Sequence, residues 1–219
     1  LGLDYCNPLS NSLQQVGFSL IQPIFSSSYL SYGISSLEQD AKEINYLLQY
    51  LLQRGIQQIF LMGHSTGCQD IVFWSKNTQS FELPTQLKGV ILQAPASDRL
   101  YMEQTLGSDA LRDWLNQARD LRSSDFFLPR TCNHGIPITP ERFESLFAIN
   151  GADDLFSADL DDSVWIENFR SLTVPTLVVF SGADEYVPFS EQFSMEHVRD
   201  KFTVACPQLV EFVELPDSN

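Results

Sequence analysis

Positive charge is scarce in this sequence. Its 219 residues include 13 Lys and Arg against 28 Asp and Glu, which gives a formal net charge of −15 at pH 7. A surface this negative repels phosphate groups, which argues against nucleic-acid binding and against electrostatic docking to a membrane. Long apolar runs are missing too, since none approaches the roughly 18 residues of a membrane span. We expect no nucleic-acid partner and no membrane span.

Cysteines are few and widely separated. Their spacing indicates neither a zinc site, nor a redox motif, nor a disulfide-rich secreted fold; they are Cys6, Cys68, Cys132 and Cys206. There is no phosphate-binding glycine loop, and the acidic residues at 153–162 lack the spacing of a calcium loop. We therefore interpret Asp153 and Asp154 as solvated surface, and we expect no metal and no cofactor. The lack of Asn-x-Ser/Thr sequons favours a cytoplasmic protein.

Strand-like apolar runs alternate with helical patterns along the chain. The predicted strands are 17–24, 56–62, 89–92, 174–180 and 209–215, and the predicted helices are 37–54, 67–76 and 190–201. Strands separated by helices in this order indicate βαβ units and a doubly wound, mostly parallel α/β sheet. We expect residues 1–219 to form a single domain. Because the first residue is not Met, we also expect a piece of a longer chain.

A long segment, at about 96–170, interrupts this alternation. It contains no convincing strand, and its patterns predict helices over 101–122, 140–148 and 162–169. An insertion of this length is rarely a bare loop. Its helices could complete a side layer of the fold, or they could form a lid over the carboxyl ends of the strands, where open α/β sheets bind ligands. We favour the lid.

One motif carries chemistry. Residues 63–67 read Gly-His-Ser-Thr-Gly, with a predicted buried strand before them and a predicted helix after them. This context is typical of the nucleophile elbow of α/β-hydrolases, so we predict that Ser65 is a nucleophile held in a strained turn. Both glycines are expected to be needed because backbone passes close to the turn. The N–H of Thr66, at the start of the helix, is the expected oxyanion donor.

The nucleophile needs a base and an orienting acid, which follow the serine in this fold in the order acid, then histidine. Asp184 comes directly after a late predicted strand and is the predicted acid. Asp98 is its competitor, although the adjacent Arg99 suggests a structural ion pair. Of the three histidines, His64 is interpreted as a packing residue, and the other two, His134 and His197, occupy the wrong places in the chain order. We therefore expect the base shortly after residue 219.

Several motifs together resemble a particular family, the fungal, plant and algal α/β-hydrolases catalogued as domain of unknown function 1749. They are Gly63-His64-Ser65-Thr66-Gly67 with Gln69-Asp70, Gln93-Ala94-Pro95 with Ser97-Asp98-Arg99, Phe156-Ser157-Ala158-Asp159-Leu160, and Asp184-Glu185-Tyr186-Val187-Pro188. The resemblance implies a serine hydrolase of esterase type, and some fungal relatives are implicated in opening siderophore esters. It also implies a histidine beyond the last residue and an oxyanion turn that overlaps Leu1.

The sequence thus predicts a metal-free serine hydrolase that cleaves a small or medium-sized ester through an acyl-enzyme. Two alternatives stay open. The same triad could serve a thioesterase or an acyltransferase, and a chain that had lost the base would be a non-catalytic binding protein with this fold.

Overall fold

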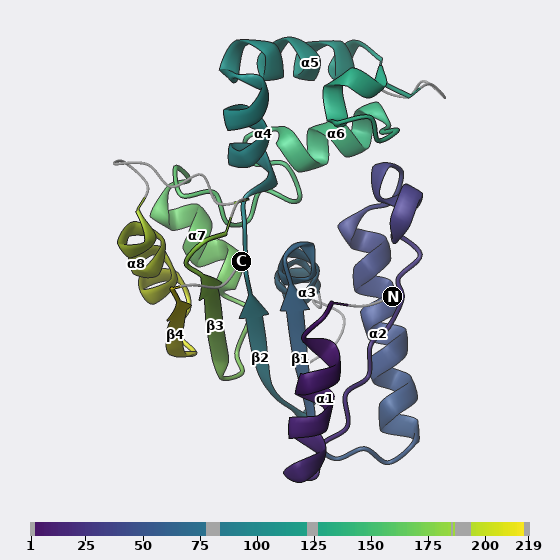
Figure 1. Cartoon of the computed structure of the whole chain (residues 1–219), viewed down its shortest axis with the longest axis vertical. Helices are drawn as coiled ribbons and strands as arrows, with labels where there is room; N and C mark the ends of the chain where they lie inside the picture. Colours follow the sequence, from purple (N-terminus) through teal and green to yellow (C-terminus); the bar gives the residue numbers. More distant parts are fainter. Residues whose placement is uncertain (1–2, 78–83, 122–126, 185, 187–193, 217–219) are drawn as a thin grey trace.

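In a computed structural model of the chain, one parallel sheet organises the fold (Figure 1). The structure describes residues 3–77, 84–121, 127–184, 186 and 194–216. Within these residues the strands are β1 (Ile59–His64), β2 (Leu87–Gln93), β3 (Thr176–Ser181) and β4 (Leu209–Leu215), in the order β1-β2-β3-β4. Each strand pairs in parallel with the next, which confirms the predicted fold class.

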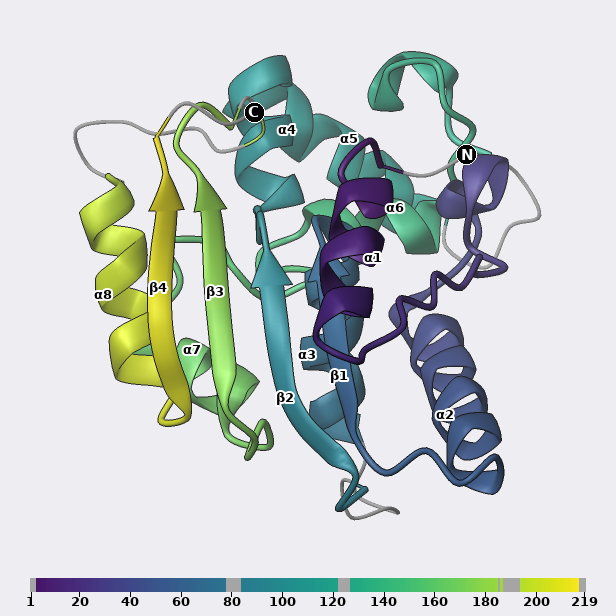
Figure 2. The ribbon, with the colours of Figure 1, turned by 60° about the horizontal axis from the view of Figure 1, so that its bottom comes forward.

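Helices lie on both faces of the sheet (Figure 2). The helices α3 (Thr66–Asn77), α7 (Asp162–Phe169) and α8 (Met195–Ala205) lie behind it in this view. The core between these helices and the sheet is rich in aromatic rings and includes Trp165, Phe169, Phe180 and Phe202. In front of β1 lies α1 (Cys6–Gln15), which the sequence did not predict.

The predicted strand over 17–24 is wrong. Residues 18–25 have no regular secondary structure, and Ile21 and Ile24 are exposed. Pro23 cannot donate a hydrogen bond to a strand ladder, which disfavours a paired strand here. The segment touches the sheet through the ring of Phe18, whose centroid lies 5.6 Å from that of Phe60 on β1.

The long helix expected over 37–54 is present as α2 (Leu37–Gln53). The side chain of Ser36 caps it by accepting a hydrogen bond from the N–H of Gln39 at 3.3 Å. Its apolar face packs beside α3 and β1 and includes Ala41, Ile44 and Leu48. A short 3-10 helix, η1 (Tyr29–Gly33), precedes it.

The segment between β2 and β3 is helical, as predicted. It contains α4 (Asp98–Leu106), α5 (Ser108–Asp120), the 3-10 helix η2 (Arg130–Asn133) and α6 (Pro140–Phe147). These four elements, called the cap below, lie over the carboxyl ends of the strands (Figure 1). They share a core of their own, which includes Met102, Leu128, Phe143 and Leu146. Such a core is what an independent layer needs, and a bare loop would lack one.

Two details of this segment differ from the prediction. The helix expected over 101–122 is two helices, because Gly107 adopts a φ of 87° and breaks it. The last helix, α7, contacts α3 and α8, which cover the same face of the sheet, and it is not part of the cap. In the described residues, no helix is long and apolar enough to cross a membrane.

Candidate active site

Ser65 lies in the sharp turn between β1 and α3. Its φ is 52°, a left-handed conformation that is uncommon for any residue other than glycine. Two backbone hydrogen bonds hold this turn: the N–H of Ser65 donates to the carbonyl of Gln93 at 3.0 Å, and the N–H of Cys68 donates to the carbonyl of Ser65 at 2.8 Å. The strand, the strained serine and the helix are the parts that the sequence predicted.

The two glycines of the motif have different roles. A Cβ atom on Gly63 would lie 2.3 Å from the carbonyl oxygen of Gly67, so only glycine fits there. A Cβ atom on Gly67 would meet nothing within 4 Å. The expectation that both glycines are needed is therefore wrong for Gly67, because a side chain has room there. The backbone of Gly67 is what excludes a side chain at position 63.

The structure describes one of the two predicted oxyanion donors, Thr66. Thr66 is the first residue of α3, and the N–H groups of a first helical turn have no partner within the helix. The positive end of the helix dipole also lies there, beside Ser65. Leu1 is outside the described residues, so the second predicted donor stays a prediction.

Asp184 follows β3 and lies in a tight turn. Its Oδ1 accepts a hydrogen bond from the N–H of Tyr186 at 2.9 Å. The N–H of Gly182 in the same turn donates to the carbonyl of Leu215 at 2.9 Å, and a Cβ atom on Gly182 would lie 2.7 Å from the carbonyl oxygen of Pro216. The chain that leaves β4 therefore passes next to the turn of Asp184. Ser65 and Asp184 follow β1 and β3, with β2 between them.

None of the three histidines hydrogen-bonds to Ser65 within the part of the chain that is described. Nδ1 of His64 contacts Oε1 of Gln93, and its ring lies 5.8 Å from that of Tyr5, which fits the predicted packing role. His134 lies in the cap, with its ring 6.3 Å from that of Tyr101. Nε2 of His197 lies 3.1 Å from the carbonyl oxygen of Ala158, to which it can only donate.

Asp98 is the first residue of α4, and its environment differs from the expected one. Its Oδ2 accepts a hydrogen bond from Nε2 of Gln69 at 2.8 Å. In the described residues no ion pair joins Asp98 to Arg99, whose guanidinium pairs instead with Asp154 at 2.9 Å and with Asp159. Burial, followed by the charge of Asp153, raises the pKa of Asp98 to about 7.

The interpretation of Asp153 and Asp154 as solvated surface is wrong. Both side chains are buried, with 2% and 4% of their surface exposed. Asp153 pairs with Nη1 of Arg142 at 2.7 Å, and Nε of Arg142 donates to the carbonyl of Tyr32 at 3.1 Å. These contacts tie α6 of the cap to η1.

Sequence reasoning also missed two buried carboxylates on the helices beside the elbow. Asp40 on α2 and Asp70 on α3 are 4% and 5% exposed. Burial, followed by the charge of Asp40, raises the pKa of Asp70 to about 8. Burial is also the largest cause of the raised pKa of Asp40. A signal existed in the sequence, because Asp40 occupies the apolar face of α2, three residues after Leu37 and four before Ile44.

These acidic residues do not form a metal site. In the part of the chain that is described, no three His, Cys, Asp or Glu side chains are arranged to hold a metal ion. Arginines pair with three of the acidic residues of this region: Arg99 pairs with Asp154 and Asp159, and Arg142 pairs with Asp153.

Comparison with known proteins shows what the chain is similar to. It is 32% identical over 185 residues to a UPF0613 protein of Schizosaccharomyces pombe, and the match covers 78% of this chain and 58% of that protein. It is 29% identical to the fusarinine C esterase sidJ of Aspergillus fumigatus, over 84% of this chain and 67% of that protein. The chain thus spans about three fifths of the fission-yeast relative and two thirds of the fungal esterase.

Solved structures agree on the architecture. The siderophore hydrolase EstB of Aspergillus fumigatus superposes with a TM-score of 0.76 at 27% identity, covering 99% of this chain and 77% of that one. An α/β-hydrolase-fold protein of unknown function superposes with a TM-score of 0.68 at 18% identity, covering 97% and 72%, and it supports the fold alone. The family described as "Protein of unknown function (DUF1749)" matches residues 1–211. With the strand, strained serine and helix in place, this match shows that the chain belongs to the DUF1749 family and has the α/β-hydrolase fold.

Proposed function

We propose that this protein is a serine hydrolase that cleaves an ester of a small or medium-sized organic molecule. The observation that carries the proposal is Ser65, which has a φ of 52° between the strand β1 and the N-terminus of α3. A serine in a strained turn of this kind is the arrangement that presents a nucleophile in the α/β-hydrolase fold, and Ser65 is half-buried here. The names of two relatives, a fusarinine C esterase and an esterase, support ester chemistry.

The proposed reaction has two steps. Oγ of Ser65 attacks the ester carbonyl carbon while a histidine takes the hydroxyl proton, and the N–H of Thr66 donates to the resulting oxyanion. The C–O bond to the alcohol then breaks, and the histidine returns the proton to the leaving oxygen. Water attacks the acyl-enzyme by the same route and releases the acid and free Ser65.

We propose that the base comes from the chain that follows β4. Gly182 contacts Leu215 and Pro216, so a histidine shortly after these residues would lie beside the turn of Asp184. Asp184 would then orient the imidazole ring. His197 is a poorer candidate, because its Nε2 already faces the carbonyl oxygen of Ala158.

Kinetics of the full-length protein on a p-nitrophenyl ester tests the proposal. We expect Ser65→Ala to abolish hydrolysis, and Ser108→Ala, an exposed serine of the cap, to leave the rate unchanged. Activity that survives in folded Ser65→Ala would refute the proposed nucleophile. Activity lost in His197→Ala, but kept when the first histidine after β4 is replaced, would refute the proposed base.

The two alternatives give different results in the same assay. A thioesterase or acyltransferase would prefer a thioester, or would transfer the acyl group to an added alcohol in place of water. A binding protein would be folded and inert towards every ester. Hydrolysis of the simple ester, with water as the acceptor, is the result that the proposal requires.

A further inference from the structure

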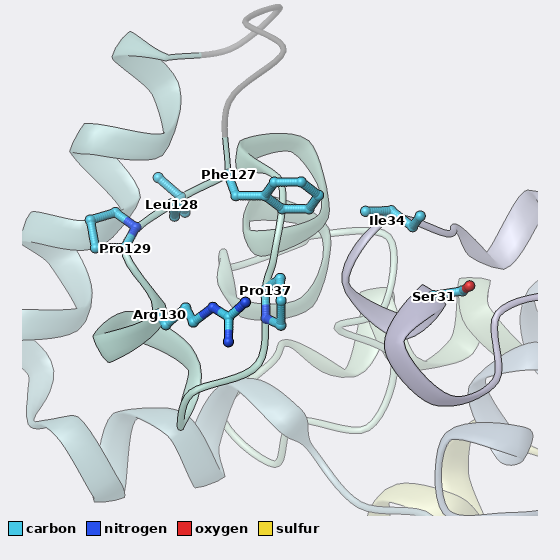
Figure 3. A pocket seen from close by; sticks show the side chains of 7 residues that line it. All are labelled: Ser31, Ile34, Phe127, Leu128, Pro129, Arg130 and Pro137. Atoms are coloured by element: carbon cyan, nitrogen blue, oxygen red, sulfur yellow. The ribbon is translucent and has the colours of Figure 1, made fainter.

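A pocket of about 510 Å³ lies between the cap and η1, and the proposed catalytic residues do not line it. Its volume is within the range of small-molecule sites. Most of its lining is apolar and consists of Ile34, Phe127, Leu128, Pro129 and Pro137. Figure 3 shows the ring of Phe127 and the side chain of Ile34 pointing towards each other across the pocket.

The walls of this pocket are held by backbone contacts. The N–H of Thr139 donates to the carbonyl of Gly33 at 2.9 Å, and a Cβ atom on Gly33 would lie 1.8 Å from the carbonyl oxygen of Pro137. The N–H of Leu128 donates to the carbonyl of Ile138, also at 2.9 Å. These contacts connect η1 to the cap on one side of the pocket and hold the two walls in place.

The polar groups of the pocket are few, and one of them is a cation. Arg130 and Ser31 complete the lining, and the guanidinium of Arg130 lies next to Pro137 (Figure 3). The structure describes six arginines between residues 96 and 170. Those that form ion pairs with carboxylates are Arg99, Arg112, Arg119, Arg142 and Arg170.

Arg130 is the exception, since it forms no ion pair within the described residues, although the chain has 28 acidic residues. An exposed guanidinium with no carboxylate partner among the described residues, beside exposed apolar side chains, suits a ligand that carries both an anion and an apolar body. Phe127 is 53% exposed and Ile34 is 56% exposed, so both leave apolar surface for that body to cover.

We propose that this pocket binds an amphipathic monocarboxylate. The carboxylate pairs with the guanidinium of Arg130, whose planar fork matches it in two parallel hydrogen bonds. The apolar body lies between Phe127 and Ile34. The net charge of −15 disfavours ligands of higher negative charge, such as a phosphate dianion, so a single carboxylate is the better match.

Isothermal titration of the full-length protein with octanoate tests this assignment. We expect saturable binding that Arg130→Gln weakens by about tenfold or more, as for the loss of a charge-assisted hydrogen bond. Arg112→Gln is the matched control, since Arg112 is an exposed arginine of the same cap that pairs with Asp109. Octanamide, which has the same chain without the charge, should bind wild-type protein as weakly as octanoate binds Arg130→Gln.

A second variant tests the apolar wall. Phe127→Ala should weaken octanoate more than butyrate, because only the longer chain reaches the ring. Equal affinities of octanoate and octanamide, an unchanged affinity in Arg130→Gln, or no saturation up to about 10 mM octanoate would each overturn the assignment. The titration requires no turnover, so its failure would leave the hydrolase proposal standing, and a failure of hydrolysis would leave this one standing.

Discussion

Ser65 combines an unfavourable backbone conformation with hydrogen bonds that hold it in place. A left-handed non-glycine residue costs about 1–3 kcal/mol, and such residues persist where the surrounding structure fixes them. Here the contacts to Gln93 and Cys68 fix it. The sequence could predict this residue, because strand, motif and helix are all local patterns. It could not predict the partners, because the contact between Ser65 and Gln93 joins the turn after β1 to the end of β2.

Two carboxylates compete for the role of the acid, and substitution separates them. Asp184→Asn in the full-length protein should reduce kcat for the proposed hydrolysis by up to about 10⁴-fold, because the imidazole would lose the group that orients it. Asp98→Asn should act mainly through stability, since Asp98 is hydrogen-bonded to Gln69 under the cap. Steady-state kinetics on a p-nitrophenyl ester measures both variants. If folded Asp98→Asn is inactive and Asp184→Asn is active, the assignment of the acid is wrong.

At the scale of elements, the two glycines around the turn between β1 and α3 should differ in how well they tolerate a side chain. Gly63→Ala should destabilise the protein by about 1–3 kcal/mol or more, because the new methyl group meets the backbone of Gly67, which cannot move aside. Gly67→Ala should stay within about 1 kcal/mol of wild type, because the space at that position is open. Urea unfolding of the two variants measures the difference, and equal stabilities would contradict it.

The elements themselves were predictable to different degrees. The pattern of α2 and the runs of β1 to β4 are periodic and local, so their positions followed from the sequence to within a few residues. The segment 17–24 has the same apolar character, but no strand pairs with it among the described residues. Pairing is a property of the whole sheet, and a single run of residues does not reveal it.

At the scale of the whole molecule, buried charges join the cap to the sheet layer. Arg142 reaches from α6 to Asp153 and to the backbone of Tyr32, while Arg99 reaches from α4 to Asp154. Spacing could not reveal that Arg99 pairs with Asp154 and Asp159, because these two residues lie more than fifty positions away along the chain. The acidic residues Asp153 and Asp154 therefore resemble surface in the sequence, although the fold buries both.

The buried Asp70 should make stability depend on pH. Its pKa rises from an ordinary value of 3.8 to about 8 in the folded chain, because of burial and the nearby charge of Asp40. Folding therefore takes up a proton between these two values, and this stabilisation is complete below the lower value. The free energy of unfolding should fall as the pH rises from about 4 to about 8.

Two variants check this dependence by urea unfolding at several pH values. Asp70→Asn cannot ionise, so its curve should be flatter than that of the wild type and should lie above it near pH 8. Asp113→Asn, at an exposed position of α5, should follow the wild type. Equal slopes of Asp70→Asn and the wild type over this range would show that folding does not raise the pKa of Asp70.

Covalent labelling tests most directly whether Ser65 is a nucleophile. Full-length protein treated with a fluorophosphonate should gain one adduct, which peptide mass spectrometry should locate on Ser65. Ser65→Ala should gain none, and Asp184→Asn should react more slowly because its base is poorly oriented. An unlabelled wild-type protein that is folded, or an adduct on any other residue, would contradict the account.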